Sequence, residues 1–253
     1  MIQVTIIGSG NVARHLIKAF SEKAEIELVQ VFSRKPHAVA NIVNTTQIIS
    51  EYNQLQPVDL IIIAVSDDAI ATVSNQIPFQ NQLVVHTSGS VNIDTLNARN
   101  RKGVFYPLQT FSKSKTVDFK IIPICLEAQN ESDYKTLETV AESISNVIYP
   151  VNSEQRKALH VAAVFVSNFV NHLYQMGNEI CIENHLSFDI LKPLIQETAH
   201  KILTLSPKEA QTGPAKRNDT QTINAHLSFL KEENQKEIYK LLTKSIIDHG
   251  KKL

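Results

Sequence analysis

Residues near the N-terminus have the types and spacing needed to hold a diphosphate. The segment Gly8 to Ala13 reads Gly-Ser-Gly-Asn-Val-Ala, directly after a β-forming run and before a segment of helical apolar spacing. The first glycine allows a tight strand-to-helix turn, the second lets backbone approach the diphosphate, and the alanine keeps the helix close to the sheet. The helix N-terminus adds free N–H groups and a positive dipole. The expected dinucleotide contacts are Gly8, Ser9, Gly10, Asn11 and Val12, and a bare structural turn is the alternative.

The end of the second predicted strand, Ile26 to Phe32, indicates which dinucleotide would bind. NAD sites carry an acidic residue about 20 residues past the glycine pattern, where it binds the ribose 2′-hydroxyl. This chain has Ser33, Arg34 and Lys35 there instead. Two cations and a hydroxyl suit a 2′-phosphate, and Arg34 could also stack on adenine. The sequence therefore predicts NADP rather than NAD, and a solvated basic turn is the alternative.

Two further strand ends should meet the same ligand, because the carboxyl ends of parallel strands share one edge of a sheet. Both carry small or hydroxylated residues, which permit close approach of ribose and nicotinamide. The expected contacts are Ala64, Val65 and Ser66 after one buried strand, and Thr87, Ser88 and Gly89 after the next. We interpret Asp67 and Asp68 as caps of the following helix rather than ligand contacts.

The elements that position these residues change class near residue 150. Strands alternate with helices before that point, which is typical of a doubly wound parallel sheet. After residue 153 the sequence predicts only helices, over 154–183, 190–205 and 220–248. We place a dinucleotide-binding domain at 1–152 and an all-α domain at 153–253. The first of these helices is apolar almost all round between 158 and 170, so we expect other helices to surround it.

Composition excludes several classes of protein. Twenty-five basic residues balance 25 acidic ones, so no net charge attracts nucleic acid or an anionic membrane. The longest apolar run, 161–166, is far shorter than the roughly 20 residues of a spanning helix. The two cysteines, Cys125 and Cys181, share no short spacing, which argues against a disulfide scaffold or a cysteine metal site. We therefore expect a cytoplasmic protein that binds no metal, nucleic acid or membrane.

Taken together, these motifs resemble a family of Rossmann proteins with an all-helical C-terminal domain. Its members include pyrroline-5-carboxylate reductase, deazaflavin-dependent NADP oxidoreductases and 6-phosphogluconate dehydrogenase. An uncharacterised branch, a Rossmann-like domain joined to a domain of unknown function, is similar also at residues 86–89, 106–111, 159–163 and 212–219. The resemblance implies a Rossmann sheet with a 6-phosphogluconate dehydrogenase-like helical domain, an NADP-linked activity, and a homodimer formed through the helices.

Several residues beyond the glycine pattern are candidates for the chemistry. His160 and Asn168 are interpreted as one face of the long helix, lining a substrate cleft with His160 as general acid. Tyr106 could donate to a carbonyl or imine. The predicted substrate contacts are Gln109, Ser167 and Arg217, the last as a carboxylate clamp. The alternatives are a solvent-exposed helix face, core packing by Tyr106, and a solvated turn around Arg217, in which Asp219 caps the last helix or pairs with Arg217.

These residues lead to two hypotheses of different class. The first is an NADP(H)-dependent oxidoreductase that transfers hydride between the nicotinamide and a small carbonyl, imine or deazaflavin-type substrate. The second is an NADP-binding sensor or scaffold without turnover. In the resembling hydroxyacid dehydrogenases a catalytic lysine stands four residues before an asparagine. With Asn168 as that asparagine, this chain has Val164 in the lysine position, which favours the second hypothesis.

Overall fold

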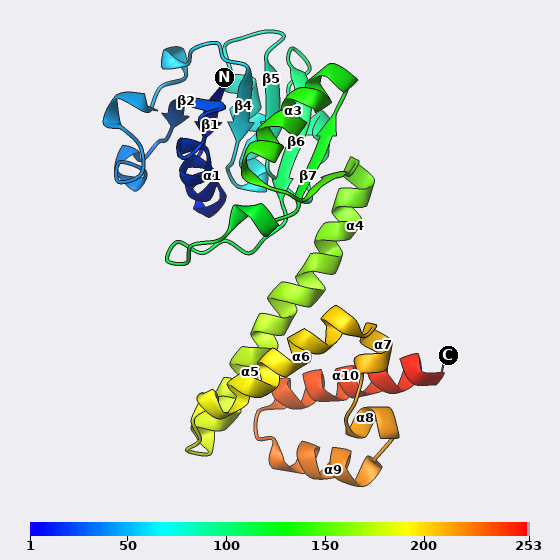
Figure 1. Ribbon diagram of the computed structural model, residues 1–253. Coiled ribbons are helices and arrows are strands. Elements are labelled where there is room, and N and C mark those ends of the chain that lie inside the picture. Colours follow the sequence, from blue (N-terminus) through cyan, green and yellow to red (C-terminus); the bar gives the residue numbers. More distant parts are fainter. Residues whose placement is uncertain (252–253) are drawn as a thin grey trace. The chain divides into compact units, whose positions relative to one another are not determined.

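The computed structural model describes residues 1–251 and contains an eight-stranded sheet (Figure 1). The strand order is β3-β2-β1-β4-β5-β6-β7-β8. The strands are β1 (Ile2–Ile7), β2 (Ile26–Phe32), β3 (Ile48–Ile49), β4 (Leu60–Ile63), β5 (Leu83–His86), β6 (Arg101–Pro107), β7 (Ile124–Ala128) and β8 (Ile148–Pro150). The predicted fold class, a doubly wound sheet followed by helices, is confirmed.

One strand pair departs from the parallel sheet predicted. β6 and β7 are antiparallel, with Tyr106 opposite Cys125, whereas β7 and β8 are parallel to each other. The connection over 108–123 holds only a 3₁₀ turn, Phe119–Ile121, and no α-helix. A parallel neighbour needs a long crossover, usually through a helix, so the chain here returns in the opposite direction.

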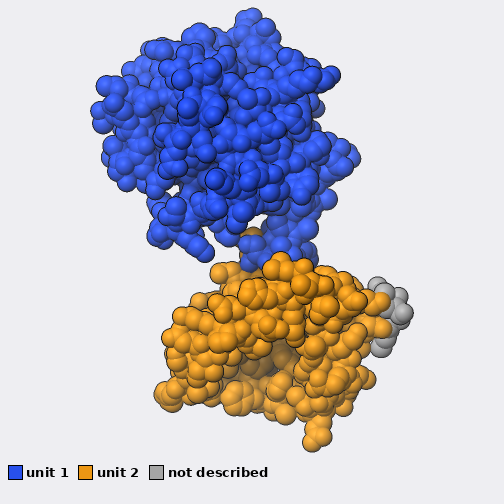
Figure 2. All heavy atoms as spheres, viewed as in Figure 1, with its two compact units in different colours: residues 1–167 blue, residues 168–253 orange. Residues whose placement is uncertain are grey.

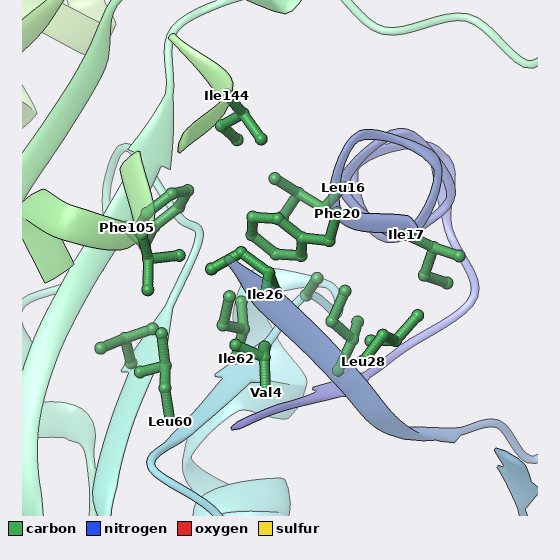
Figure 3. Close-up of a cluster of buried hydrophobic side chains, with 14 of the residues drawn as sticks. Val4, Leu16, Ile17, Phe20, Ile26, Leu28, Leu60, Ile62, Phe105 and Ile144 are labelled. Carbon is green, nitrogen blue, oxygen red and sulfur yellow. The ribbon is translucent and has the colours of Figure 1, made fainter. Parts of the chain in front are cut away.

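The sheet is covered by α1 (Asn11–Ser21), α2 (Ile70–Gln76) and α3 (Glu131–Ile144). All four residues of β4 are buried, which explains the unbroken apolar run of its sequence. Figure 3 shows Leu16 and Phe20 of α1 among side chains of β1, β4 and β6. The N-cap of α3 is Asn130, whose side chain accepts a hydrogen bond from the Asp133 N–H. The helices are therefore packed on the sheet through a shared apolar core.

The chain divides into two compact units, residues 1–167 and a second that begins at Asn168 (Figure 2). The predicted domain boundary, after residue 152, falls at the N-cap of α4 (Ser153–Ala163), directly after β8. A π-helical segment, Val164–Phe169, separates α4 from α5 (Val170–Glu183). The second unit also contains α6 (Lys192–Thr204), α7 (Pro207–Ala210), α8 (Pro214–Arg217), α9 (Thr220–Phe229) and α10 (Glu233–Lys251).

Two details of the predicted helices were wrong. The helix predicted over 220–248 is two helices, because Leu230 has extended backbone angles and ends α9. The apolar middle of the first long helix was expected to be surrounded by other helices. In the single chain, Val161 is 52% exposed and Val166 is 74% exposed. Within residues 1–251 no helix has both the length and the apolar character needed to cross a membrane.

Candidate functional site

The turn between β1 and α1 uses its two glycines for different reasons. Gly8 has a φ of 142°, a conformation that favours glycine, and an added Cβ would overlap the carbonyl oxygen of Ala64 at the end of β4. Gly10 has no such constraint, because within residues 1–251 no atom beyond its chain neighbours and its own helix lies within 4 Å of a Cβ built on it. Gly10 is also the N-cap of α1 and supplies no capping side chain. The first N–H groups of α1 therefore border open space that an anion could occupy.

A cavity of about 790 Å³ opens at this turn and runs along the edge where β1, β2 and β4 end. All the predicted cofactor residues line it except Ser88 and Gly89. Its walls also include residues that we did not predict: Ile7, Phe32, Tyr52, Ala69, Thr72, Val73 and Gln76. The structure thus brings the four predicted strand ends, those of β1, β2, β4 and β5, together around one cavity, whose volume suits a large ligand.

The basic turn after β2 forms one end of this cavity. Arg34 and Lys35 are exposed, whereas Ser33 is buried. The Ser33 hydroxyl accepts a hydrogen bond from the Lys35 N–H at 3.1 Å and donates one to the Lys35 carbonyl at 3.0 Å. Ser33 therefore shapes the turn, and Arg34 and Lys35 present the positive charge. Beside them the rings of Phe32 and Tyr52 are stacked, with centroids 4.3 Å apart.

A second cluster lies at the ends of β5 and β6. The Tyr106 hydroxyl is 3.1 Å from Nδ1 of His160 on α4. Gly89 packs against both, because an added Cβ would lie 2.6 Å from that Nδ1 and 2.8 Å from the Tyr106 hydroxyl. Burial raises the pKa of Tyr106 to about 12, so its phenol stays protonated at ordinary pH. Thr87, two residues before Gly89, lines the cavity at the Gly8 turn. The segment that follows β5 therefore links this cluster to that cavity.

A buried ion pair holds α4 against the sheet. Arg156 is 1% exposed and pairs with the carboxylate of Glu127 on β7. Its guanidinium also donates to the Val91 carbonyl at 2.6 Å, and the Ser153 hydroxyl donates to Glu127 at 2.9 Å. His160 follows Arg156 by four residues and so lies on the same side of the helix. The ion pair therefore fixes the helix face that carries His160.

Among the residues that follow β4 and β5, Ser88 has structural partners, whereas Asp67 and Asp68 do not cap a helix. The Ser88 hydroxyl accepts hydrogen bonds from the N–H groups of Ser90 and Val91, each at 3.1 Å, and so closes a local turn. The expectation that Asp67 or Asp68 caps the following helix was wrong. Ser66 occupies the N-cap position, and both aspartates lie in the first turn of the 3₁₀ helix Asp67–Ala69 without a capping bond. Their charge is still favourable there, because the first turn has a positive dipole.

The remaining predicted substrate residues are not gathered into one cluster by the described contacts. Gln109 is exposed, and its side-chain oxygen accepts from the Thr110 N–H at 2.7 Å. Ser167 ends the first unit, whereas Asn168 and Arg217 are exposed residues of the second. The helix-face argument for His160 and Asn168 assumed an uninterrupted α-helix, and the π-helical segment between them has a different pitch. That spacing argument therefore no longer supports a shared face.

The prediction that Asp219 caps the helix that begins at Thr220 is confirmed. Asp219 is the N-cap of α9, and its carboxylate accepts from the Thr222 N–H at 3.0 Å and from the Thr222 hydroxyl at 2.8 Å. These hydrogen bonds hold the pKa of Asp219 below its usual value. Within residues 1–251 no group of three His, Cys, Asp or Glu side chains could hold a metal ion.

Comparison with known proteins identifies the family. Residues 3–90 match the family described as NADP oxidoreductase coenzyme F420-dependent, and residues 122–246 match a domain of unknown function. A crystal structure of a "putative NADP oxidoreductase" from Bacteroides fragilis is 38% identical, with 98% of each chain covered and a TM-score of 0.89. The chain belongs to this family of NADP oxidoreductases.

More distant structures share the fold of this family. A Thermotoga maritima protein is 22% identical over 98% of both chains, with a TM-score of 0.75. The pyrroline carboxylate reductase of Plasmodium falciparum, solved with NADP bound, is 16% identical over 99% of this chain and 97% of its own, with a TM-score of 0.61. No curated protein matches the sequence. The predicted resemblance to Rossmann oxidoreductases with a helical C-terminal domain is confirmed.

Some of the residues that line the cavity or support the site were not predicted, and only some of them could have been recognised from the sequence. Thr72, Val73 and Gln76 lie on the helix that follows β4, and a helix after a strand end regularly borders the ligand. That signal was available. Tyr52 follows β3 outside any motif, and only the fold shows its stacking on Phe32. Arg156 reads as an ordinary charged residue of a helix, so its burial carried no signal in the sequence.

Proposed function

We propose that this NADP oxidoreductase transfers hydride from NADPH to a small carbonyl, imine or deazaflavin-type acceptor. The open space at Gly10, at the head of the cavity, carries the proposal because no contact in the described part of the chain requires a glycine there. The net reaction consumes NADPH, the acceptor and one proton, and yields NADP⁺ and the reduced acceptor. The cofactor supplies the hydride, while the chain binds and orients it. The reverse direction uses the same groups.

The residues divide into cofactor contacts and candidates for the acceptor. We assign the diphosphate to the turn Gly8 to Val12 and the 2′-phosphate to Arg34 and Lys35. We assign the acid–base chemistry to His160 together with Tyr106. Their contact with each other and with Gly89 supports this assignment. Asn168, Ser167, Gln109 and Arg217 stay predicted substrate contacts.

NADPH fluorescence tests cofactor binding directly, because the chain contains no tryptophan to interfere. We expect NADPH to bind, and stereospecifically labelled NADPH to lose its deuterium to one member of a panel of ketoacids, imines and deazaflavins. Binding without turnover on any of these substrates would favour the sensor or scaffold, as the valine at position 164 does. Absence of binding would overturn both hypotheses.

Arg34→Ala is expected to narrow the preference for NADPH over NADH by about 1–3 kcal/mol, the range of a charge-assisted contact. The physical reason is the loss of a guanidinium that can face the 2′-phosphate in a bidentate manner. Fluorescence titration of both cofactors measures the ratio. Lys18→Ala, at an exposed position in the last turn of α1, is the matched control and should leave it unchanged. An unchanged ratio in Arg34→Ala would remove the basic turn from the site.

We also propose a homodimer formed through the helical unit. Large apolar side chains are exposed on several helices of this unit, among them Leu203 at 78% and Leu241 at 68%, and a contact between two copies would bury such side chains. We expect size-exclusion chromatography with light scattering to give twice the mass of one chain. Leu241→Glu should shift the mass toward the monomer, whereas Lys240→Glu, at the neighbouring exposed position, should not. A monomeric wild-type protein would contradict the proposal.

A further inference from the structure

The hydrogen bond between Tyr106 and His160 indicates which of the two residues faces the substrate and which one positions the other. The Tyr106 side chain is buried, and among residues 1–251 the hydrogen bond assigned to its hydroxyl is the one to His160 Nδ1. A buried hydroxyl that fails to donate its proton loses about 1–3 kcal/mol. Because the phenol stays protonated, with a pKa of about 12, it has a proton to donate. The acceptor in reach is the imidazole nitrogen.

We infer that Tyr106 is a positioning residue that donates its O–H to Nδ1 of His160, and that the imidazole is thereby held with its proton on Nε2. A neutral imidazole has one donor nitrogen and one acceptor nitrogen, and the hydrogen bond at one determines the state of the other. His160 Nε2–H is then the group offered to the substrate. The role of Nε2–H toward a substrate rests on the proposed function. The hydrogen bond between Tyr106 and His160 does not depend on it.

Two surrounding contacts keep this arrangement in place. Gly89 leaves no room for the rings to move apart in its direction, since even a methyl group there would lie 2.6 Å from Nδ1. The Arg156–Glu127 pair fixes the helix turn that precedes His160. The hydrogen bonds within residues 1–251 assign no protein partner to Nε2, and the His160 side chain is partly exposed. One edge of the ring is therefore occupied by protein, and the other remains for a ligand.

The tautomer limits what His160 can recognise. An Nε2–H is a hydrogen-bond donor, so it fits a lone pair such as that of a carbonyl oxygen or an imine nitrogen. Such a bond draws electron density from the carbon that receives the hydride. Tyr106 in this arrangement does not contact the substrate, and its phenol acts only through the imidazole.

Two-bond ¹H–¹⁵N correlation spectra of the imidazole rings test the inference on the full chain, at mildly alkaline pH and without cofactor. Loss of one set of signals in His160→Gln assigns them. We expect wild-type His160 to show Nδ1 as the unprotonated nitrogen and Nε2 as the protonated one. In Tyr106→Phe the two ¹⁵N shifts should move toward each other, because both tautomers are then populated. A wild-type spectrum with the proton on Nδ1, or an unchanged tautomer in Tyr106→Phe, would overturn the inference.

The chain offers a matched control for the variant. Tyr239 and His226 form a similar pair in the helical unit, with the hydroxyl 2.8 Å from Nδ1, and Tyr239→Phe should leave the His160 signals unchanged. If Tyr106→Phe does not fold, the wild-type spectrum alone decides which nitrogen carries the proton. The spectra need no cofactor, so failure of NADPH binding would reject the proposed function and leave this result standing.

Discussion

Gly10→Asp is expected to fold as the wild type does and to weaken NADPH binding by at least about 100-fold, or about 2.7 kcal/mol. Gly10 has φ −72° and ψ −173°, angles that any residue can adopt, and a Cβ added there would meet no more distant part of residues 1–251. Aspartate is also a favourable N-cap, so the melting temperature should hold or rise. The carboxylate would occupy the diphosphate position with the wrong charge. Fluorescence titration and thermal unfolding measure the two quantities.

Two further variants separate the possible outcomes. Gly10→Asn has nearly the same size without the charge, so its affinity should fall less than that of the aspartate variant. Gly8→Ala should instead lower the stability of the fold, because φ at Gly8 is 142° and the new Cβ would overlap the Ala64 carbonyl. Unchanged NADPH affinity in Gly10→Asp would show that the cofactor does not use this helix end.

Arg156→Met is expected to lower the free energy of unfolding by about 3–5 kcal/mol, because it leaves the Glu127 carboxylate without its cation in a largely buried site. Urea unfolding of residues 1–253 measures the change. The double variant Arg156→Met with Glu127→Met should recover much of the loss, since apolar residues of similar volume often replace a buried ion pair at little cost.

A surface pair provides the comparison for this result. Lys135 and Glu131 form an ion pair on α3 at 2.8 Å with both side chains exposed. Lys135→Met should change the free energy of unfolding by less than about 1 kcal/mol, since water screens such pairs. Equal effects of Arg156→Met and Lys135→Met would show that the Arg156 pair does not fix α4.

The fold could be predicted largely from local signals. The apolar run over 60–65 predicted a strand buried on both faces, which the structure has as β4, and the turn at Gly8 identified the junction of β1 and α1. The antiparallel β7 was not predicted, because strand direction depends on what the connection at 108–123 lacks rather than on the strand residues. The break at Leu230 was missed for a similar reason, since no glycine or proline marks it.

The candidate site was predictable where it depends on strand ends and unpredictable where it depends on long-range packing. Ala64 and Thr87 line the cavity because each directly follows a parallel strand. Tyr106 and His160 were named separately, but nothing in the sequence indicated that they touch across a sequence separation of 54. The burial of Arg156 is also a property of the assembled fold, because it depends on β7 and on the loop at Val91.

The cofactor cavity is built from residues 7–87, whereas His160 arrives on a helix that follows the two reversed strands. The proposed nucleotide contacts and the proposed acid–base residue thus come from separate parts of the chain. Mutation can change the part of the chain that carries His160, and with it the choice of substrate, while the residues that line the cavity stay the same. A common N-terminal half joined to C-terminal halves of divergent chemistry is the evolutionary pattern that this layout permits.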